Sequence, residues 1–179
     1  RQGIAGCYGG YSTDQYLHAE DTASAIARIW SVDFTQVGTG SSQDLNTPTL
    51  REGRWPEQPD ECLIEVRTPG EFKVGDTLTL DPAKGEEPVT DTLKTDTFTI
   101  VGVADWSMYV DFERGTTTVG NGKVESYILV PPEAFTLEVY TDVFLTLEDT
   151  RELYAYDQVY TDTVQAYAEQ LEADAPDIY

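Results

Sequence analysis

The sequence predicts an α+β fold that is rich in β-strands, with a mixed sheet, a β-rich inserted subdomain and a C-terminal amphipathic helix. Short apolar runs of strand length recur from Ile4 to Leu147, and Gly, Pro, Asn and Asp residues separate them. Apolar residues recur at clear helical spacing only between Asp149 and Asp174. These two observations place the strands first and the helix last.

Length and composition indicate one folded, acidic domain of 179 residues. Hydrophobic residues make up 40% of the chain and aromatic residues 11%, which argues against disorder. The net charge is −22, with 33 acidic residues against 11 lysines and arginines. Because such a surface repels phosphate, nucleic acid is not an expected partner, and anionic lipid headgroups are disfavoured. A solvated acidic surface is the simplest explanation of the charge.

The N-terminal part of the chain predicts a hairpin of two strands. The first strand covers Ile4–Leu17, with a break at two glycines, and its tyrosines favour β structure. A polar turn over His18–Thr22 leads to the second strand, Ala23–Val32, whose side chains alternate. A helix is the alternative for Thr22–Trp30 because alanine is frequent there. The stretch Phe34–Leu45 is rich in Gly, Ser, Gln and Asp and predicts a loop.

The middle of the chain predicts strands separated by turns. Three of them are expected at Glu61–Val66, Thr77–Leu80 and Leu93–Val103. The dipeptide Asn121-Gly122 is the strongest hairpin signal in the chain and favours a type I′ turn. The expected return strand is Val124–Val130, and the two prolines that follow end it.

The last part of the chain predicts a strand and then a helix. The strand is Val139–Leu147, in which apolar residues alternate. Asp149 as N-cap with Glu152 three residues later forms a capping box, which predicts a helix from Asp149 to Asp174, ended by Pro176. Its apolar stripe consists of Leu153, Tyr156, Tyr160, Val164, Tyr167 and Leu171. Because the stripe needs burial, we expect this helix to lie across a sheet.

Four stretches carry a resemblance to a known family. The first is E-G-R-x-P-E-x-P-x-E at Glu52–Glu61, followed by a strand and by K-V-G-D-T-L-T-L at Lys73–Leu80. The others are F-x-I-V-G at Phe98–Gly102, the loop and hairpin at Arg114–Val124, and Phe135–Leu147 before the last helix. In this order they resemble the extracytoplasmic domain of FtsX/MacB-type ABC transporter permeases, the MacB-like periplasmic core domain family in its Gram-positive branch. The resemblance covers most of the chain.

The resemblance implies a single extracytoplasmic domain, excised from a membrane protein, over residues 1–179. A membrane-proximal subdomain with a sheet and the last helix would take about residues 1–33 and 136–179. A β-rich insert would take about residues 45–135. The family's leading helix would lie before Arg1, in agreement with a chain that does not begin with Met.

The resemblance also implies a function without catalysis. The domain would lie on the extracytoplasmic face of the cell membrane and couple cytoplasmic ATP hydrolysis to export or mechanotransmission, with the last helix as a lever. Its partners would be the permease's own transmembrane helices, a cytoplasmic ABC ATPase that does not touch this domain, and an extracytoplasmic protein. No cofactor is implied.

The two cysteines, Cys7 and Cys62, allow two states. They are either two buried free thiols or one disulfide that closes a loop of about 55 residues and contributes about 2–4 kcal/mol. The extracytoplasmic resemblance favours the disulfide, because such bonds persist outside the cytosol.

The residues themselves nominate no catalytic or metal site. His18 is the only histidine and no serine lies in a nucleophile-elbow pattern, so a Ser-His-Asp arrangement is not expected. The sequence contains no D-x-D-x-D-G calcium loop, and two cysteines with one histidine are too few for a closed zinc site. With 33 acidic residues, no pair of carboxylates stands out for acid–base catalysis.

The candidates for a contact surface are three aromatic residues: Trp55, Trp106 and Tyr109. The alternative is that all three pack inside the protein, as we expect for Trp30. Arg54 and Arg114 are scarce cations in an acidic chain, and we expect each to pair with a nearby carboxylate.

Two other functions compete with the transporter domain. The first is a binding module of a cell-surface protein, for a carbohydrate or a protein ligand, because exposed aromatic rings stack on sugars. The second is a secreted hydrolase that uses acidic residues, which is disfavoured because the sequence contains no recognisable nucleophile or metal constellation.

Overall fold

The computed structural model describes the chain except for residues 1–2, 19–24, 83–87, 110–111, 151 and 175–179. Within this part, the strands are β1 (Ile4–Gly10), β2 (Ser12–Leu17), β3 (Ala25–Ser31), β4 (Pro48–Gly53), β5 (Glu61–Ile64), β6 (Thr77–Asp81), β7 (Thr97–Trp106), β8 (Ser126–Val130) and β9 (Asp142–Leu147). The helices are the short 3-10 helices η1 (Val89–Asp91), η2 (Pro132–Ala134) and η3 (Glu148–Thr150) and the α-helix α1 (Gln158–Asp174).

Seven of these strands form one sheet, which we name the closed sheet. Their order is β4-β7-β5-β8-β3-β2-β6, and β6 pairs with β7 as well, so that six strands close a ring and β4 is attached to it through β7. Two pairs, β3 with β8 and β5 with β7, run parallel, and the other pairs run antiparallel. The mixed sheet followed by a C-terminal helix confirms the predicted α+β fold.

Part of the predicted N-terminal hairpin is present, because β2 and β3 pair antiparallel from Ser12↔Trp30 to Leu17↔Ala25. The helix alternative for the second strand is therefore wrong. The predicted first strand, Ile4–Leu17, is divided, and its first part, β1, pairs with β9. Ala25, Ala27 and Ile29 of β3 face the interior of the closed sheet, whereas Trp30 faces the opposite side, as strand alternation requires. Most of the predicted turn lies outside the described residues, at positions 19–24.

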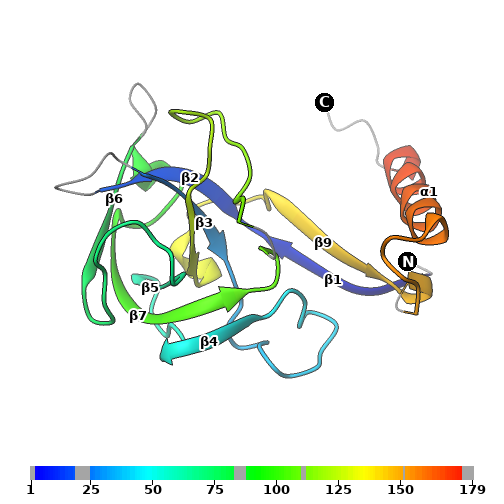
Figure 1. The fold of residues 1–179 in the computed structure, drawn as a ribbon, viewed down its shortest axis with the longest axis horizontal. Coiled ribbons are helices and arrows are strands. Elements are labelled where there is room, and N and C mark those ends of the chain that lie inside the picture. The colour runs from blue at the N-terminus through cyan, green and yellow to red at the C-terminus, as the bar shows by residue number, and fades with distance from the viewer. Residues whose placement is uncertain (1–2, 19–24, 83–87, 110–111, 151, 175–179) are drawn as a thin grey trace.

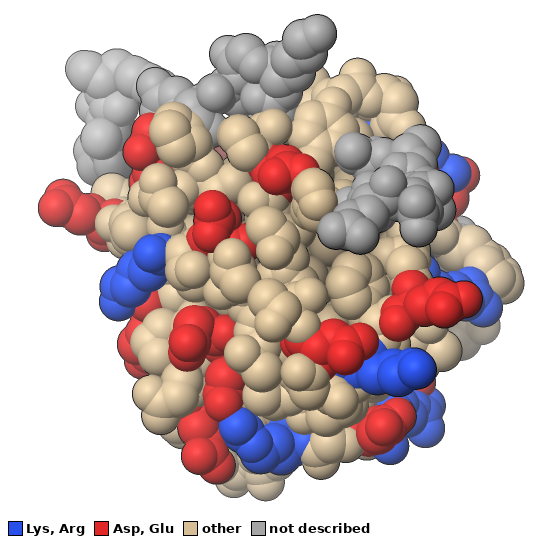
Figure 2. All heavy atoms as spheres, turned by 90° about the vertical axis from the view of Figure 1, so that its left-hand side faces the viewer, with Lys and Arg blue, Asp and Glu red and all other residues tan. Residues whose placement is uncertain are grey.

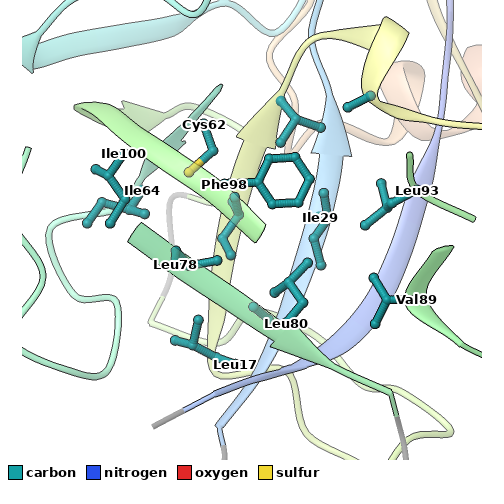
Figure 3. Packing of buried hydrophobic residues seen from close by; sticks show 14 of the residues in the cluster. Leu17, Ile29, Cys62, Ile64, Leu78, Leu80, Val89, Leu93, Phe98 and Ile100 are labelled. Atoms are coloured by element: carbon teal, nitrogen blue, oxygen red, sulfur yellow. The ribbon is translucent and has the colours of Figure 1, made fainter. Parts of the chain in front are cut away.

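The core fills the inside of the closed sheet (Figure 3). Side chains from strands far apart in the sequence meet there, and most of them are fully buried: Leu17, Ile29, Cys62, Ile64, Leu78, Leu80, Val89, Leu93, Phe98 and Ile100. A second apolar cluster covers the outer side of the sheet around Trp30, Trp106 and Tyr127. Trp30 is therefore a core residue, as predicted.

A two-stranded ribbon of β1 and β9 projects from the closed sheet (Figure 1). The strands pair antiparallel from Ile4↔Leu147 to Gly10↔Asp142. At the far end, the Glu148 N–H donates a hydrogen bond of 3.0 Å to the Gly3 carbonyl. The ring of Tyr167 from α1 lies against the same glycine. The first strand, the last strand and the helix therefore meet at one end of an elongated molecule.

The helix differs from its prediction in start and in position. α1 begins at Gln158, because the chain after β9 first forms η3 and then two turns, closed by bonds from the Leu153 N–H to the Thr150 carbonyl and from the Asp157 N–H to the Tyr154 carbonyl. Asp149 therefore lies in η3 and does not cap α1, and Leu153 and Tyr156 precede the helix. The helix lies beyond the end of the ribbon and does not cover a sheet (Figure 1). Its innermost residues are only half-buried: Tyr160, Thr163, Tyr167 and Leu171. Pro176 lies outside the described residues.

The predicted type I′ turn at Asn121-Gly122 is also wrong. A type I′ turn needs positive φ at both central residues, and Asn121 does not have it. Instead, the Gly122 N–H bonds the Val119 carbonyl at 3.0 Å, so that Gly120 (φ +54°) and Asn121 form the centre of the turn. The two arms of the predicted hairpin do meet, through an isolated antiparallel bridge between Thr116 and Lys123 and a bond of 3.1 Å from the Val124 N–H to the Gly115 carbonyl. The chain then continues into β8, which pairs with β3 and β5.

The sheets group the strands differently from the layers expected from the sequence. The expected layer combined the segments of β1, β2, β3 and β9 with the last helix, but β2 and β3 belong to the closed sheet and only β1 pairs with β9. The division into two subdomains stays a prediction. Acidic and basic side chains are interspersed over the end of the closed sheet that faces away from α1 (Figure 2). Among the described residues, no helix has the length and apolar character needed to span a membrane.

Candidate functional site

A buried ion pair forms the base of the candidate site. Arg114 donates hydrogen bonds to Glu65 of 2.7 Å from Nη2 and 3.1 Å from Nε. The side chains are only 9% and 4% exposed. Glu65 also accepts a bond of 3.2 Å from the Tyr127 backbone N–H. The hydrogen bonds that Arg114 donates to Glu65 raise the pKa of Arg114, so the guanidinium remains charged.

Stacked aromatic rings surround this pair. Tyr109 and Tyr127 lie face to face, with centroids 4.9 Å apart and planes 6° apart. Trp106 meets both edge-on, at 5.8 and 5.9 Å. The Arg114 guanidinium lies 5.3 Å from the Tyr109 ring and 5.6 Å from the Tyr127 ring, within range of a cation–π contact. Burial raises the pKa of both tyrosines, so both phenols stay neutral at physiological pH.

Hydrogen bonds fix the positions of these rings. Trp30 Nε1 donates to Tyr109 Oη at 2.8 Å, and Tyr127 Oη donates to the Ala104 carbonyl at 3.1 Å. Trp106 Nε1 donates to the carbonyl of Asn46, at the end of the loop before β4. The rings are thus held by three different segments and form a preorganised surface.

An open cleft of about 310 Å³ lies over this surface, and we name it the Arg114 cleft. It is lined by Glu65, Val66, Arg67, Asp105, Trp106, Tyr109, Phe112, Arg114 and Tyr127. Arg67 lies over the exposed ring of Phe112, with its guanidinium carbon 4.4 Å from the centroid. The described lining therefore offers aromatic faces, guanidinium groups and carboxylates, which suit binding of a planar or hydroxylated ligand.

The structure brings two of the three predicted contact residues together. Trp106 and Tyr109 both line the Arg114 cleft, but Trp106 is only 5% exposed, so packing accounts for its position. Trp55 is half-buried and stacks on Phe34, with centroids 5.6 Å apart. Tyr127 was not predicted from the sequence, because it begins the apolar run Tyr127–Val130, which indicates only a buried strand.

Both arginine predictions are confirmed. Arg54 pairs with Glu61, and Arg114 pairs with Glu65. His18 is an exposed residue whose Nδ1 lies 2.7 Å from Asp81. Among the described residues, no group of three or more His, Cys, Asp and Glu side chains is placed to hold a metal ion.

The predicted disulfide is absent from the structure. Cys62 is fully buried inside the closed sheet, whereas Cys7 is exposed on the ribbon. The two thiols are free because their side chains belong to different sheets and different environments.

No protein-family model matches the chain, and no curated protein matches it. Among solved structures, the fold is similar to the extracellular domain of the noncanonic ABC-type transporter YknZ from Gram-positive bacteria. The sequence identity is 10%, the TM-score is 0.46, and the match covers 83% of this chain and 69% of the other. This degree of likeness establishes neither a shared function nor a shared ligand.

Proposed function

We propose that this chain is a non-catalytic extracytoplasmic domain of an ABC transporter permease, in which it couples cytoplasmic ATP hydrolysis to export or to mechanotransmission. The observation that carries the proposal is the meeting of β1, β9 and α1 at one end of the molecule (Figure 1). The closed sheet is thereby displayed at the opposite end of the ribbon. The four sequence stretches that resemble FtsX/MacB-type permeases support the same function.

The ribbon has the properties of a mechanical stem. β1 contains seven residues, which corresponds to a length of about 20 Å. Cross-strand hydrogen bonds link β1 to β9 from one end to the other, with one irregularity between Ile4 and Gly6. Two bonded strands resist shear better than one chain, so a displacement at the α1 end moves the closed sheet with it.

Helix α1 is the proposed lever. Its 17 residues form a rod of about 25 Å. The rod is attached to the base of the ribbon through Tyr167, whose ring lies against Gly3. In this function the partners are the permease's own transmembrane helices, a cytoplasmic ABC ATPase that acts through them, and an extracytoplasmic protein at the closed sheet.

The proposal is tested in the full-length permease with a break in the lever. Val164 lies in the middle of α1 and is 37% exposed, so Val164→Pro interrupts the rod while leaving the closed sheet intact. We expect ATP hydrolysis to continue while transport, or activation of the extracytoplasmic partner, falls at least severalfold. Val164→Ala is the matched control and should keep both activities.

Two results would overturn this function. One is unchanged coupling in the Val164→Pro protein. The other is a reading frame that encodes no apolar span of about 20 residues on either side of the chain, because a permease domain requires such spans. Urea unfolding of the isolated domain with and without Val164→Pro separates loss of coupling from loss of folding.

A cell-surface binding module is the second candidate function, and the Arg114 cleft favours it. Phe112 is 78% exposed at its rim, and Tyr109 is half-buried in its floor. A glycan screen with the wild-type domain tests this function directly. Retention that is lost in Tyr109→Ala and Phe112→Ala proteins would support it, and a wild-type domain that retains no glycan would reject it for carbohydrate.

A further inference from the structure

A second open cleft lies where the ribbon meets the closed sheet, and we name it the tyrosine cleft. Its volume is about 400 Å³, within the range of sites that hold small molecules. It is lined by Tyr8, Gly9, Tyr11, Asp33, Gln43, Pro132, Glu133 and Tyr140. These residues come from β1, from the junction between β1 and β2, from the loop after β3, from η2 and from the segment before β9.

Aromatic faces form one wall of this cleft. Tyr11 packs between Phe135 and Tyr140, with ring centroids 5.3 and 5.1 Å away. Tyr140 lies over the bare backbone of Gly9, where an added Cβ would come within 2.5 Å of the ring. Despite these contacts Tyr140 remains 57% exposed, so one face of its ring is open to a ligand.

Tyr8 adds a third ring and is firmly positioned. Its Oη donates a hydrogen bond of 2.6 Å to the Ser31 carbonyl, and its ring stacks on Phe144 at 5.8 Å. Burial and, to a lesser extent, the charge of Asp33 raise the pKa of Tyr8. The phenol is therefore neutral at physiological pH and offers an intact π face.

Two carboxylates complete the cleft. Asp33 is held in place by the backbone N–H and the hydroxyl of Thr35, which donate to its Oδ1 at 3.0 and 2.6 Å. Glu133 lies at the exposed rim on η2. None of the described lining residues is a lysine or an arginine, in contrast to the Arg114 cleft. The lining thus combines π faces with negative charge.

We propose that the tyrosine cleft binds a small organic cation that carries an ammonium group. Aromatic faces attract a cation through their quadrupoles, and this attraction is strongest for quaternary ammonium groups that are weakly hydrated. Asp33 and Glu133 add a direct charge attraction in a protein that already carries a net charge of −22. A ligand of this class fits the volume of the tyrosine cleft. Neither the transporter function nor the glycan-binding function proposed above involves such a ligand.

Choline and its uncharged isostere dimethylbutanol are the probes for this site. Isothermal titration calorimetry of the 179-residue chain at physiological ionic strength should show binding of choline and at least roughly tenfold weaker binding of the alcohol. Tyr140→Ala and Asp33→Asn should each weaken choline binding by roughly fivefold or more. Gly9→Ala should act in the same way, because the new methyl group displaces the Tyr140 ring.

Matched variants elsewhere serve as controls. Tyr156→Ala removes an 89% exposed tyrosine, and Asp60→Asn removes one exposed charge, both outside the cleft. We expect choline affinity to remain unchanged in both. Equal binding of choline and the alcohol, no binding of choline, or equal losses in Asp33→Asn and Asp60→Asn proteins would overturn the proposal. The last result would identify diffuse attraction to the acidic surface. Urea midpoints verify that each variant is folded.

Discussion

Gly53 of β4 and Gly102 of β7 are direct register partners in the closed sheet. Gly53 has φ +80°, and an added Cβ there would collide with the Val101 carbonyl oxygen. A Cβ at Gly102 would lie 2.7 Å from the Glu52 carbonyl oxygen. Two strands approach each other here more closely than side chains allow, next to the point where Val101 forms a bulge opposite β5.

We therefore expect Gly53→Ala to destabilise the protein by about 2–4 kcal/mol, because it adds a backbone clash to an unfavourable φ. Gly38→Ala is the matched control. Gly38 also has positive φ, +73°, but an added Cβ there meets no atom within 4 Å, so only about 1 kcal/mol should be lost. Urea unfolding measures both values, and equal losses would show that the close approach carries no cost.

For the buried ion pair of Arg114 and Glu65, we expect the effects of two substitutions on the free energy of unfolding to be non-additive. Arg114→Met leaves the Glu65 carboxylate buried without its cation and should cost about 3–5 kcal/mol. Glu65→Gln in the same protein removes that charge but still accepts the Tyr127 N–H, so most of the loss should be recovered. Additive losses in the double variant would contradict this account.

The exposed ion pair of Arg51 and Asp105 serves as the comparison for the buried pair of Arg114 and Glu65. Its side chains are 59% and 48% exposed. Arg51→Met should therefore change the free energy of unfolding by less than about 1 kcal/mol.

Glu61 predicts a specific dependence of stability on pH. Arg54 donates two hydrogen bonds to its carboxylate, at 2.9 and 2.5 Å, and these bonds lower the pKa of Glu61 from 4.5 to about 2. Because the folded pKa is lowered, the stabilisation is present above pH 4.5 and is lost as the pH falls toward 2.

The measurement compares the wild type with Glu61→Gln. The difference in their free energies of unfolding should be largest near neutral pH and should vanish near pH 2. Glu138→Gln, at an exposed position, controls for the loss of one acidic charge. A difference between wild type and Glu61→Gln that does not depend on pH would contradict the assignment.

The two cysteines should differ sharply in reactivity. Cys7 is exposed on the ribbon, while burial inside the closed sheet raises the pKa of Cys62. Titration of the native protein with a thiol reagent should show one fast thiol, and the second should react on the order of a hundredfold more slowly. Cys7→Ser should remove the fast phase and Cys62→Ser should not. Two thiols are expected after denaturation, and fewer would show that a disulfide had formed.

The strands could be predicted because their signals are local. In β7, Phe98 and Ile100 alternate with polar residues, and both side chains lie in the core. The partners of each strand could not be predicted. The parallel pairing of β3 with β8 joins residues about a hundred positions apart, and no local pattern specifies such a partner.

The start of the helix shows that a local signal can be present without the helix that it predicts. Asp149 and Glu152 match a capping box, but the chain there forms η3 and two further turns, closed by bonds from the Leu153 N–H to the Thr150 carbonyl and from the Asp157 N–H to the Tyr154 carbonyl. α1 therefore starts only at Gln158. A helix cap contributes only about 1 kcal/mol, so it does not by itself decide where a helix begins.

The candidate site was predictable only in its parts. The sequence indicates that Arg114 pairs with a carboxylate, and it nominates Tyr109 and Trp106 as aromatic candidates. It does not indicate that Glu65 is the partner or that Tyr127 completes the stack, because both depend on β5 pairing with β8. The tyrosine cleft depends in the same way on the pairing of β1 with β9.

Because Ile4 and Leu147 are register partners, the segment of chain between them begins and ends at neighbouring positions. The chain leaves and returns at the same place, so the two ends of this segment lie little more than the width of a strand pair apart. A unit of this kind can be transplanted into a surface turn of a host without separating the residues on either side. Substitutions in the closed sheet would leave the point of attachment to such a host unchanged, because that point lies at the far end of the ribbon (Figure 1).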